Sequence, residues 1–330
     1  MKHKSTKDSW QNSSVSGIRV PPRPGSYSSS TKRVKKHRAV KWVLGILSLL
    51  LVISAVLYFA VFLPGQQGAV NDTQSSLWVR FFDVGDSDTA LVFCEGHYLL
   101  IDGGNASNSS RLYSYFTQNN ILHLDGIVAT HPHADHVGGI SGVLSIPGIS
   151  VDALYSSVKM CDNKRFMDMA EKAEAIGVGI TVPTRGDCFS LGGATVTFLS
   201  PVAGMYYEEV NNQSLVLRID YGKTSFLFMG DAMEAVENEL LTADVNLRAT
   251  VLKVAHHGSD TSTTEDFLKK VRPALSVISG NGEEGHPSQE VSSRLQSYGT
   301  VLCTADCGTI EVYSDAEHVG FATEKSLAGQ

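Results

Sequence analysis

Short apolar runs, separated by polar turns and amphipathic segments, dominate the chain from residue 77 onward. Apolar runs of about four to eight residues are typical of buried strands, and apolar residues spaced three and four apart are typical of helices that cover a sheet. The pattern predicts strands at 79–82, 90–94, 98–101, 124–130, 196–199, 215–219, 224–229, 249–255 and 275–278, and helices at 111–117, 166–175, 232–241 and 291–298. Because strands and helices alternate without an evident internal repeat, we expect one α/β domain over residues 77–330.

The N-terminal part has a different pattern. Residues 1–41 are rich in Ser, Pro, Lys and Arg and have no apolar periodicity, which predicts a disordered tail. Residues 42–63 form a run of 22 residues without a charged side chain. About 20 such residues cross the hydrocarbon core of a bilayer as a helix, so we expect a transmembrane helix here, followed by a linker at 64–76. A cleaved signal peptide is the alternative, but residues 64–69 offer no convincing small-residue cleavage site.

Charge around the predicted span indicates its orientation. Six basic residues lie shortly before Trp42, and the first charged residue after the span is Asp72. Because basic flanks remain on the cytoplasmic side, we expect a single-pass protein of the cell membrane with a cytoplasmic N-terminus. Residues 42–63 would then contact membrane lipid, and the C-terminal domain would be extracytoplasmic.

The acidic balance of the C-terminal part limits its partners. The predicted tail holds 11 of the 27 Lys and Arg residues but one of the 34 Asp and Glu residues. The remainder therefore has 16 basic and 33 acidic residues, a formal net charge of −17. Since binding to a phosphate backbone requires Lys and Arg to replace counterions, this balance argues against strong nonspecific nucleic-acid binding.

Five cysteines are too few for a disulfide scaffold in a domain of this size. Spacing along the chain permits a bond between Cys303 and Cys307 and another between Cys161 and Cys188. Cys94 lies in a predicted strand, where a buried apolar role is expected. The sequence leaves the disulfide state open.

The densest chemistry in the chain is a run of three histidines and one aspartate at positions 131–136, which are His131, His133, Asp135 and His136. Imidazole and carboxylate together are ligands of Zn²⁺. The two histidines that leave the strand at 124–130 are two residues apart and so project to the same side. A helix beginning near Val137 would turn the other two residues back toward them. The alternative is a surface histidine cluster without metal.

Later strand ends supply further candidate ligands. Two metals about 3.5–4 Å apart need a carboxylate between them, and Asp231 follows the strand at 224–229 after a glycine. The alternative for Asp231 is the N-cap of the helix at 232–241. His256 and His257 follow the strand at 249–255. Adjacent side chains of a strand point to opposite sides, so one histidine is expected to bind metal while the other faces substrate; which does which stays open.

Several motifs occur together in a fixed order. They are 82–85 with Asp88, Leu100-Ile101-Asp102-Gly103-Gly104, the 131–136 cluster, 211–217, Gly230-Asp231, 252–259, 285–287 and 304–306 with Gly308. In this order they resemble the metallo-β-lactamase superfamily, and within it the soluble hydrolase domain of ComEC-type competence proteins. The similar stretch runs from about residue 78 to 315, nearly the whole domain.

The resemblance implies a four-layer αββα sandwich behind the transmembrane helix, with two metals at the ends of both sheets. In such proteins His131 and His133 hold the first metal. Asp135, His136 and one of His256 and His257, the latter being our choice, hold the second, and Asp231 bridges the two. The resemblance further implies that Asp102 organises the loop beneath the cluster and that Asp83 and Asp88 are structural. The expected metal is Zn²⁺, with Mn²⁺ possible.

Two departures from the family pattern bear on the site. No histidine occurs between His136 and His256, and a segment beginning Asn211-Asn212 lies where the superfamily has one. Because an amide oxygen is a weaker zinc ligand than imidazole, we expect the first metal to bind weakly. The family's Asp-Val-Gly-Gln-Gly-Asp is Asp-Val-Gly-Asp-Ser-Asp here, at residues 83–88, which adds a carboxylate near the site and leaves substrate preference open.

The chemistry that follows is hydrolysis of a phosphodiester by a metal-bound hydroxide. Asp135 would orient the hydroxide, and the His256/His257 pair would serve catalysis. The residues expected to contact substrate are Asn212, Ser214, Ser259 and His286, although His286 is equally expected as a structural histidine before Pro287. The alternatives are a ComEC-like nuclease acting on extracellular DNA, and a non-catalytic metal-binding module that kept the fold. Choline-phosphate esterases of cell-wall polymers are also similar, whereas the missing histidine argues against a β-lactamase.

Overall fold

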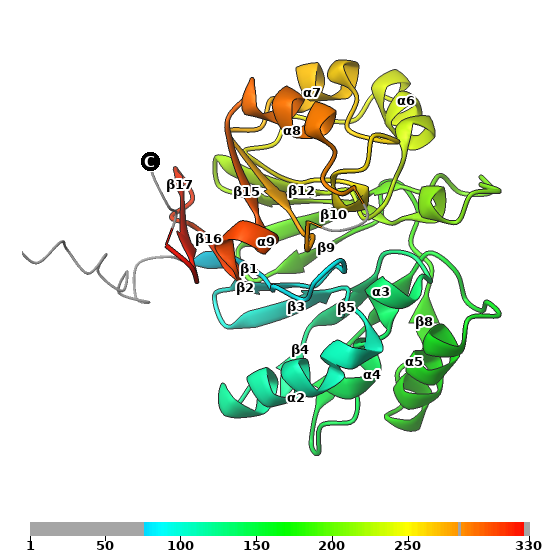
Figure 1. The fold of residues 1–330 in the computed structure, drawn as a ribbon. Coiled ribbons are helices and arrows are strands. Elements are labelled where there is room, and N and C mark those ends of the chain that lie inside the picture. The colour runs from blue at the N-terminus through cyan, green and yellow to red at the C-terminus, as the bar shows by residue number, and fades with distance from the viewer. Residues whose placement is uncertain (1–75, 283–284, 327–330) are drawn as a thin grey trace, which may run out of the picture. The chain divides into compact units, whose positions relative to one another are not determined.

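Two β-sheets form the centre of the domain (Figure 1). The computed structural model describes residues 76–282 and 285–326, which belong to one compact unit over Val70–Gln330. In those residues one sheet has eight strands, in the order β17 (Val319–Thr323), β16 (Ile310–Ser314), β1 (Leu77–Phe81), β2 (Ala90–Cys94), β3 (His97–Ile101), β5 (Gly126–Ala129), β7 (Leu154–Ser156) and β8 (Ile180–Thr181). The other has seven, in the order β15 (Thr300–Cys303), β14 (Leu275–Ile278), β13 (Val251–Lys253), β12 (Thr224–Phe228), β11 (Val216–Tyr221), β10 (Ala194–Ser200) and β9 (Cys188–Leu191). β4 (His123–Leu124) pairs with β6 (Ser150–Val151).

Helices cover the outer face of each sheet. Helices α2 (Ser109–Gln118), α4 (Ile140–Val143) and α5 (Lys164–Ala175) pack on the eight-stranded sheet, and α6 (Glu234–Thr242), α7 (Glu265–Val271) and α8 (Gln289–Gln296) pack on the seven-stranded sheet. The remaining helices are α3 (Ala134–Val137), α9 (Thr304–Cys307) and the 3₁₀ turns η1 (Ala106–Asn108), η2 (Asn211–Gln213) and η3 (His256–Gly258). The order helices, sheet, sheet, helices is the predicted four-layer α/β arrangement.

Three apolar clusters separate these layers. One lies between the sheets and includes Phe81, Phe198 and Phe226, each at most 1% exposed. The other two lie between each sheet and its helices. Strand β12 is buried along its whole length, which fits the continuous apolar run 226–228 expected of a strand buried on both faces.

Most predicted elements are present, with shifted ends. The strands at 90–94 and 275–278 match β2 and β14, while the strand expected at 124–130 is divided between β4 and β5. The helix expected from Val137 begins earlier, at Ala134, and is interrupted at Gly138 and Gly139, so that α3 and α4 are separate. The strands β6, β7, β8, β9, β15, β16 and β17 and the helix α7 were not predicted. Most of these strands have two to four residues, and such short segments carry little periodicity.

The predicted tail at 1–41, the transmembrane helix at 42–63 and all of the linker at 64–76 except Ser76 lie outside the described residues. No helix of the described part of the chain combines the length and apolar character needed to cross a membrane. The five cysteines all lie within the described residues and are free thiols, so neither disulfide that the spacing permits is present.

Gly139 marks a close approach of two backbone segments. A Cβ atom at this position would lie 1.9 Å from the carbonyl oxygen of Gly103. The two segments are also joined by hydrogen bonds from Gly103 N to His136 O, at 2.6 Å, and from Gly139 N to Gly104 O, at 2.9 Å. The loop after β3 therefore lies directly on the segment that carries His136.

We expect Gly139→Ala to lower the free energy of unfolding by about 1–3 kcal/mol, because the added methyl group forces two backbone segments apart. Gly179→Ala is the matched control, since a Cβ there meets nothing within 4 Å. Its stability should stay within about 0.5 kcal/mol of the wild-type protein. Denaturant unfolding checks both, and equal stability of the two variants would contradict the close approach.

Candidate metal centre

The predicted ligands follow strands that run in the same direction within each sheet. In the eight-stranded sheet β3, β5 and β7 are parallel, and in the other sheet β12, β13 and β14 are parallel. The carboxyl ends of such strands open into crevices where polar side chains collect. His131 to His136 follow β5, Asp231 follows β12, and His256 and His257 follow β13. The topology thus brings both sheets' polar strand ends to one place.

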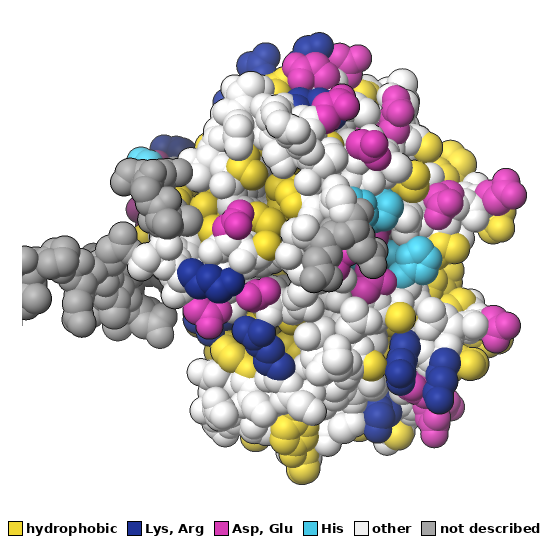
Figure 2. Space-filling model, viewed as in Figure 1, with side chains coloured by type: hydrophobic (Ala, Val, Ile, Leu, Met, Phe, Trp, Pro, Cys, Tyr) yellow, Lys and Arg dark blue, Asp and Glu magenta, His cyan; other side chains and the backbone are white. Residues whose placement is uncertain are grey.

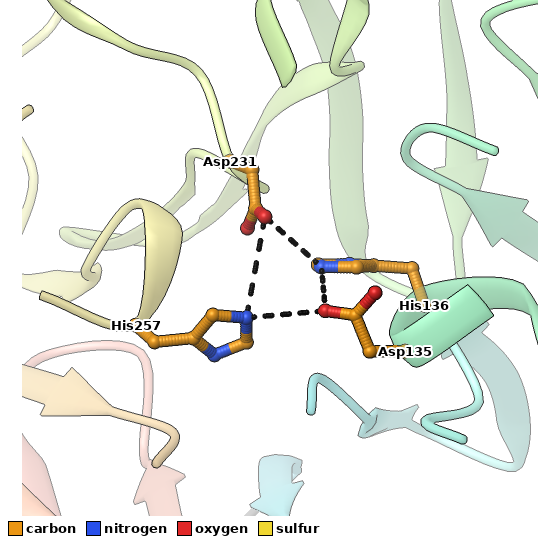
Figure 3. A group of neighbouring side chains, drawn as sticks. All are labelled: Asp135, His136, Asp231 and His257. Carbon is orange, nitrogen blue, oxygen red and sulfur yellow. Dashed lines mark ion pairs between the residues drawn. The ribbon is translucent and has the colours of Figure 1, made fainter. Parts of the chain in front are cut away.

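Four of these side chains converge on a common centre (Figure 3). The Nε2 atom of His136 lies 3.3 Å from Asp231 Oδ2 and 3.5 Å from Asp135 Oδ2. The Nε2 atom of His257 lies 3.5 Å from Asp135 Oδ2 and 4.0 Å from Asp231 Oδ2. Ligands at about 2.1 Å from a tetrahedral zinc ion are about 3.4 Å apart, so the spacing fits one ion held by all four.

A second ligand group shares one atom with the first. His131 Nε2 lies 3.0 Å from His133 Nδ1 and 3.7 Å from Asp231 Oδ2. The three residues satisfy the separations expected of a metal site. Because Asp231 belongs to both groups, its carboxylate is placed where a bridge between two ions would lie. The group at His131 has three protein ligands among the described residues and the other has four, which supports the expectation that the first metal binds more weakly.

Buried atoms without hydrogen-bond partners face this centre. They are the Nε2 atoms of His136 and His257 and the Oδ1 atom of Asp231. Buried polar atoms are normally satisfied, and leaving one unsatisfied costs about 1–3 kcal/mol. Imidazole nitrogens and carboxylate oxygens that converge in this way fit a divalent cation, which would satisfy them all.

The backbone around Asp231 explains its position. Gly230 adopts φ +54°, and a Cβ there would lie 3.0 Å from Ser214 and 3.1 Å from Thr130. The amide of Asp231 donates to Ser214 Oγ at 3.0 Å. The alternative role of Asp231 as a helix N-cap is not found, because Met233 occupies the N-cap position of α6. The glycine allows the sharp exit from β12 that aims the carboxylate at the centre.

The two adjacent histidines take separate places, although not for the reason expected. β13 ends at Lys253, and His256 and His257 lie in the turn η3 with φ of 47° and 51°. The strand-alternation argument is therefore wrong for this pair. The left-handed turn directs His257 into the four-residue group, while His256 Nδ1 lies 3.0 Å from Thr261 Oγ1 and its Nε2 lies 3.4 Å from Asn211 Nδ2.

Asp102 orients His136 from beneath. One carboxylate oxygen of Asp102 lies 2.9 Å from His136 Nδ1, and it also accepts a hydrogen bond from Thr130 Oγ1 at 2.8 Å. The other accepts from the amide of Thr130 at 2.8 Å. A carboxylate behind a histidine fixes the tautomer and ring orientation of that metal ligand, so Nε2 is left to face the ion. Thr130, the last residue of the predicted strand at 124–130, thus supports the orientation of Asp102.

Opposing charges set the protonation of the metal-free centre. Burial alone would raise the pKa of Asp231, but His136 and His131 lower it well below its ordinary value. Burial opposes protonation of His136, yet Asp231 and Asp102 raise its pKa well above the ordinary value. For His257, burial is outweighed by Asp135 and Asp231, which raise its pKa to about 9. Burial, together with His136, holds the pKa of His131 well below its usual range.

Other predicted site residues bind the polypeptide itself. Asn212 Oδ1 accepts from the amide of Met233, and Ser214 Oγ accepts from the amide of Asp231. Ser259 Oγ accepts from Thr261 Oγ1 at 3.0 Å, which extends the hydrogen-bond chain that holds His256. Substrate contact by Asn212, Ser214 and Ser259 stays a prediction.

His286 lies beside the centre, whereas Asp83 lies away from it. The His286 ring stacks on His257 with centroids 6.4 Å apart, and its Nδ1 atom is buried without a partner. Asp83 belongs to none of the ligand groups in the described residues; its carbonyl accepts from Arg111, and its carboxylate lies 3.8 Å from Lys325.

Two residues near the centre were missed as functional candidates. The side chain of Asn211 faces His256, whereas Asn212 was selected from the same motif. Lys253 is 4% exposed and its Nζ lies 2.8 Å from Asp88 Oδ2. A lysine within the apolar run 249–255 was a visible signal, because lysine is almost never fully buried without a partner.

One member of the centre reaches the surface, because the side chain of Asp135 is one-third exposed. Figure 2 shows histidine side chains reaching the surface beside acidic ones, between the half that carries α7 and the half that carries α2. A separate pocket of about 520 Å³ lies between α2 and the β16–β17 hairpin and contains none of the metal-centre residues. Two charged side chains there, Arg80 and Glu311, are paired with each other, and the convergent ligand-type side chains make the histidine face the candidate active site.

Fold and centre together are those of a metal-dependent hydrolase, and comparison with known proteins agrees. The chain belongs to the metallo-beta-lactamase superfamily, whose family description matches residues 82–282. It is 30% identical over 254 residues to ComE operon protein 3 of Bacillus subtilis, covering 71% of this chain and 32% of that protein. It is 27% identical to competence protein ComA of Neisseria gonorrhoeae, covering 76% of this chain and 34% of that one. The resemblance to ComEC-type competence proteins is thereby confirmed.

The chain spans about a third of the length of these curated relatives. Among solved structures, the metallo-beta-lactamase fold protein YhfI from Bacillus subtilis aligns with a TM-score of 0.46 at 13% identity, covering 68% of this chain and 95% of that chain.

Metal binding should release protons from the metal-free protein. His257, with a pKa of about 9, and His136 are both protonated at pH 7, and a histidine must lose that proton to bind a metal. We expect about two protons to be released per ion bound at the four-residue group, and apparent affinity to increase as the pH rises toward 9. Zn²⁺ titration calorimetry in buffers of different ionisation enthalpy measures this number, and release of less than about half a proton would contradict the assignment.

Proposed function

We propose that this domain is a metal-dependent phosphodiesterase. The observation that supports it most directly is the shared position of Asp231 Oδ2, which lies within reach of both His131 and His136 while buried imidazole nitrogens face the same space. Two-metal sites of this kind activate water for attack on phosphoryl or carbonyl centres, and at phosphorus they stabilise both the attacking and the leaving oxygen of an in-line displacement. Family membership adds the metal-dependent hydrolase class.

Each residue then has a defined role. His131, His133 and Asp231 would hold one ion, and Asp135, His136, His257 and Asp231 would hold the other. Bound Zn²⁺, or Mn²⁺, supplies Lewis acidity and makes water nucleophilic at neutral pH. Asp135 keeps one carboxylate oxygen beside His257 and is one-third exposed, so it can also orient an incoming water. Asp102 and Ser214 hold His136 and Asp231 in place.

His256 is suited to contact substrate. Burial lowers the pKa of His256, so its imidazole remains neutral and can both donate and accept a hydrogen bond. Thr261 fixes its Nδ1, and its Nε2 lies beside Asn211. The His286 ring is 5.7 Å away. These groups would stabilise the non-bridging or leaving oxygen of a phosphodiester.

The substrate class is proposed on charge and relationship. ComEC-type relatives favour DNA as the substrate of a nuclease, which is the second candidate. The formal charge of −17 outside the basic tail opposes strong binding to a phosphate backbone and favours smaller phosphodiesters or cell-wall polymers. A non-catalytic metal-binding module would keep the metals without turnover.

We further propose that residues 42–63 anchor the protein in the cell membrane with the catalytic domain outside. The support is the uncharged run of 22 residues and its basic N-terminal flank. A hydrolase held there would act on extracytoplasmic substrates.

Removing Asp231 tests the two-metal mechanism. Asp231→Ala should lower both metal content and hydrolysis of bis-p-nitrophenyl phosphate, the latter by at least about a hundredfold, since two cations would lose their shared ligand. Chelator-treated wild-type protein, reloaded with Zn²⁺, is the control. Wild-type levels of turnover in Asp231→Ala would refute the mechanism, and a metal-loaded wild type without turnover would favour the binding module.

The adjacent histidines provide an internal comparison. His257→Ala should lose metal and activity together, whereas His256→Ala should keep its metal and lose about a hundredfold in turnover, as expected for one general acid–base group. Elemental analysis and the same assay, run on both variants, separate the roles. The opposite pattern would exchange the two assignments.

A reporter fused after Gln330 tests the orientation. Because the basic flank before Trp42 should remain inside, a periplasm- or exterior-dependent reporter should be active and a cytoplasm-dependent one inactive. Exchanging the six basic residues for neutral ones is the control and should weaken that preference. Activity confined to the cytoplasmic reporter would reverse the orientation.

A further inference from the structure

Lys253 occupies an apolar position of the core beside the metal centre. Along β13, Val251 belongs to the cluster between the sheets and Leu252 to the cluster under the helices. Side chains alternate along a strand, so Lys253 lies on the face that meets the other sheet. It is 4% exposed and is the one buried lysine in residues 76–282 and 285–326. A buried ammonium is costly unless it is paired.

Its partner is a carboxylate of the opposite sheet's loop. Lys253 Nζ donates to Asp88 Oδ2 at 2.8 Å and to Val254 O at 3.0 Å. Asp88 is also 4% exposed. The pair therefore links the strand that leads to His256 and His257 with the loop between β1 and β2.

Asp88 in turn holds two parts of the metal centre. Its amide donates to the carbonyl of Asp135 at 3.2 Å, and its carbonyl accepts from the amide of Gly104 at 2.8 Å. The other carboxylate oxygen of Asp88 lies 3.8 Å from His257 Nδ1. Asp88 thus contacts metal-centre segments from both sheets.

A second buried carboxylate lies in the same place. Asp88, Asp102 and His136 place ligand-type atoms within 4.8 Å of one another. A cavity of about 10 Å³, about the size that one water needs, is lined by both carboxylates, Thr89 and Lys253. Two buried carboxylates this close require a positive charge, and Lys253 supplies one on a fixed tether.

We propose that Lys253 is a positioning residue for the metal centre: its ammonium holds Asp88, and Asp88 holds the Asp135–His136 segment in register with His257. This inference rests on the proposed two-metal centre. The hydrogen-bond partners of the Lys253 ammonium are Asp88 and the carbonyl of Val254, so it acts on the metal centre through Asp88.

A neutral pair of similar shape separates positioning from folding. In Lys253→Met/Asp88→Asn both charges are removed, so no buried charge is left unpaired and stability in chelator should match the wild-type chain. Zn²⁺ affinity of the four-residue group should nevertheless fall about ten- to a hundredfold, as for other groups that support metal ligands. Thermal unfolding in chelator and Zn²⁺ titration of the full chain measure the two effects.

A single substitution tests the tethered cation directly. Lys253→Ala enlarges the cavity and leaves Asp88 uncompensated, so Zn²⁺ affinity should fall by the same ten- to hundredfold, and added propylammonium should recover at least about tenfold of it. Lys253→Met fills the cavity and should gain nothing from propylammonium. Lys223→Ala is the matched control, because Lys223 pairs with Glu317 at 2.7 Å but is exposed; its Zn²⁺ affinity should not change.

Wild-type Zn²⁺ affinity in Lys253→Met/Asp88→Asn overturns the positioning role, and this variant decides the question if Lys253→Ala fails to fold. Failure of propylammonium to restore a folded Lys253→Ala overturns the tethered-cation assignment. A wild-type chain that binds no Zn²⁺ would instead refute the proposed function itself, which keeps the two failures distinguishable.

Discussion

Asp231 carries its carboxylate at a position that is 2% exposed, where an unpaired charge would be strongly destabilising. Three histidines face it, two from the segment after β5 and one from the turn after β13. Two of them, His136 and His257, have raised pKa values and so supply the compensating positive charge. Because those segments belong to different sheets, the charge can be satisfied only when both sheets are packed together. The buried carboxylate therefore makes the metal centre and the fold mutually dependent.

The same electrostatics explain why the centre suits cations. In the metal-free protein, protons on His136 and His257 provide the positive charge that Asp135 and Asp231 require. Divalent ions at the same place would replace those protons and satisfy the nitrogen and oxygen atoms that have no partner. The affinity of the centre for metal and the protonation of His136 and His257 therefore both depend on the negative charge of Asp135 and Asp231.

Hydrogen bonds from neighbouring residues hold the candidate ligand side chains in place. Asp102 and Thr130 fix the ring of His136 from below, and Ser214 fixes Asp231 from the side. Close backbone contact at Gly103 and Gly139 leaves this loop little freedom to move. Since small displacements of ligands weaken metal sites, such rigidity is a functional requirement as much as a structural one.

The sequence by itself determined the α/β class, most of the long strands and helices, and the set of candidate metal ligands, because each depends on local periodicity or on residue chemistry at a strand end. It also indicated that His256 and His257 have different roles. Only the tertiary structure decided which one joins the ligands, since the left-handed turn at η3 and not strand alternation directs their rings. The pairing of Lys253 with Asp88, 165 residues apart in sequence, was likewise decided by packing of the two sheets. Such a contact depends on which buried charges meet where the two sheets pack. The local sequence pattern around either residue does not predict its distant partner.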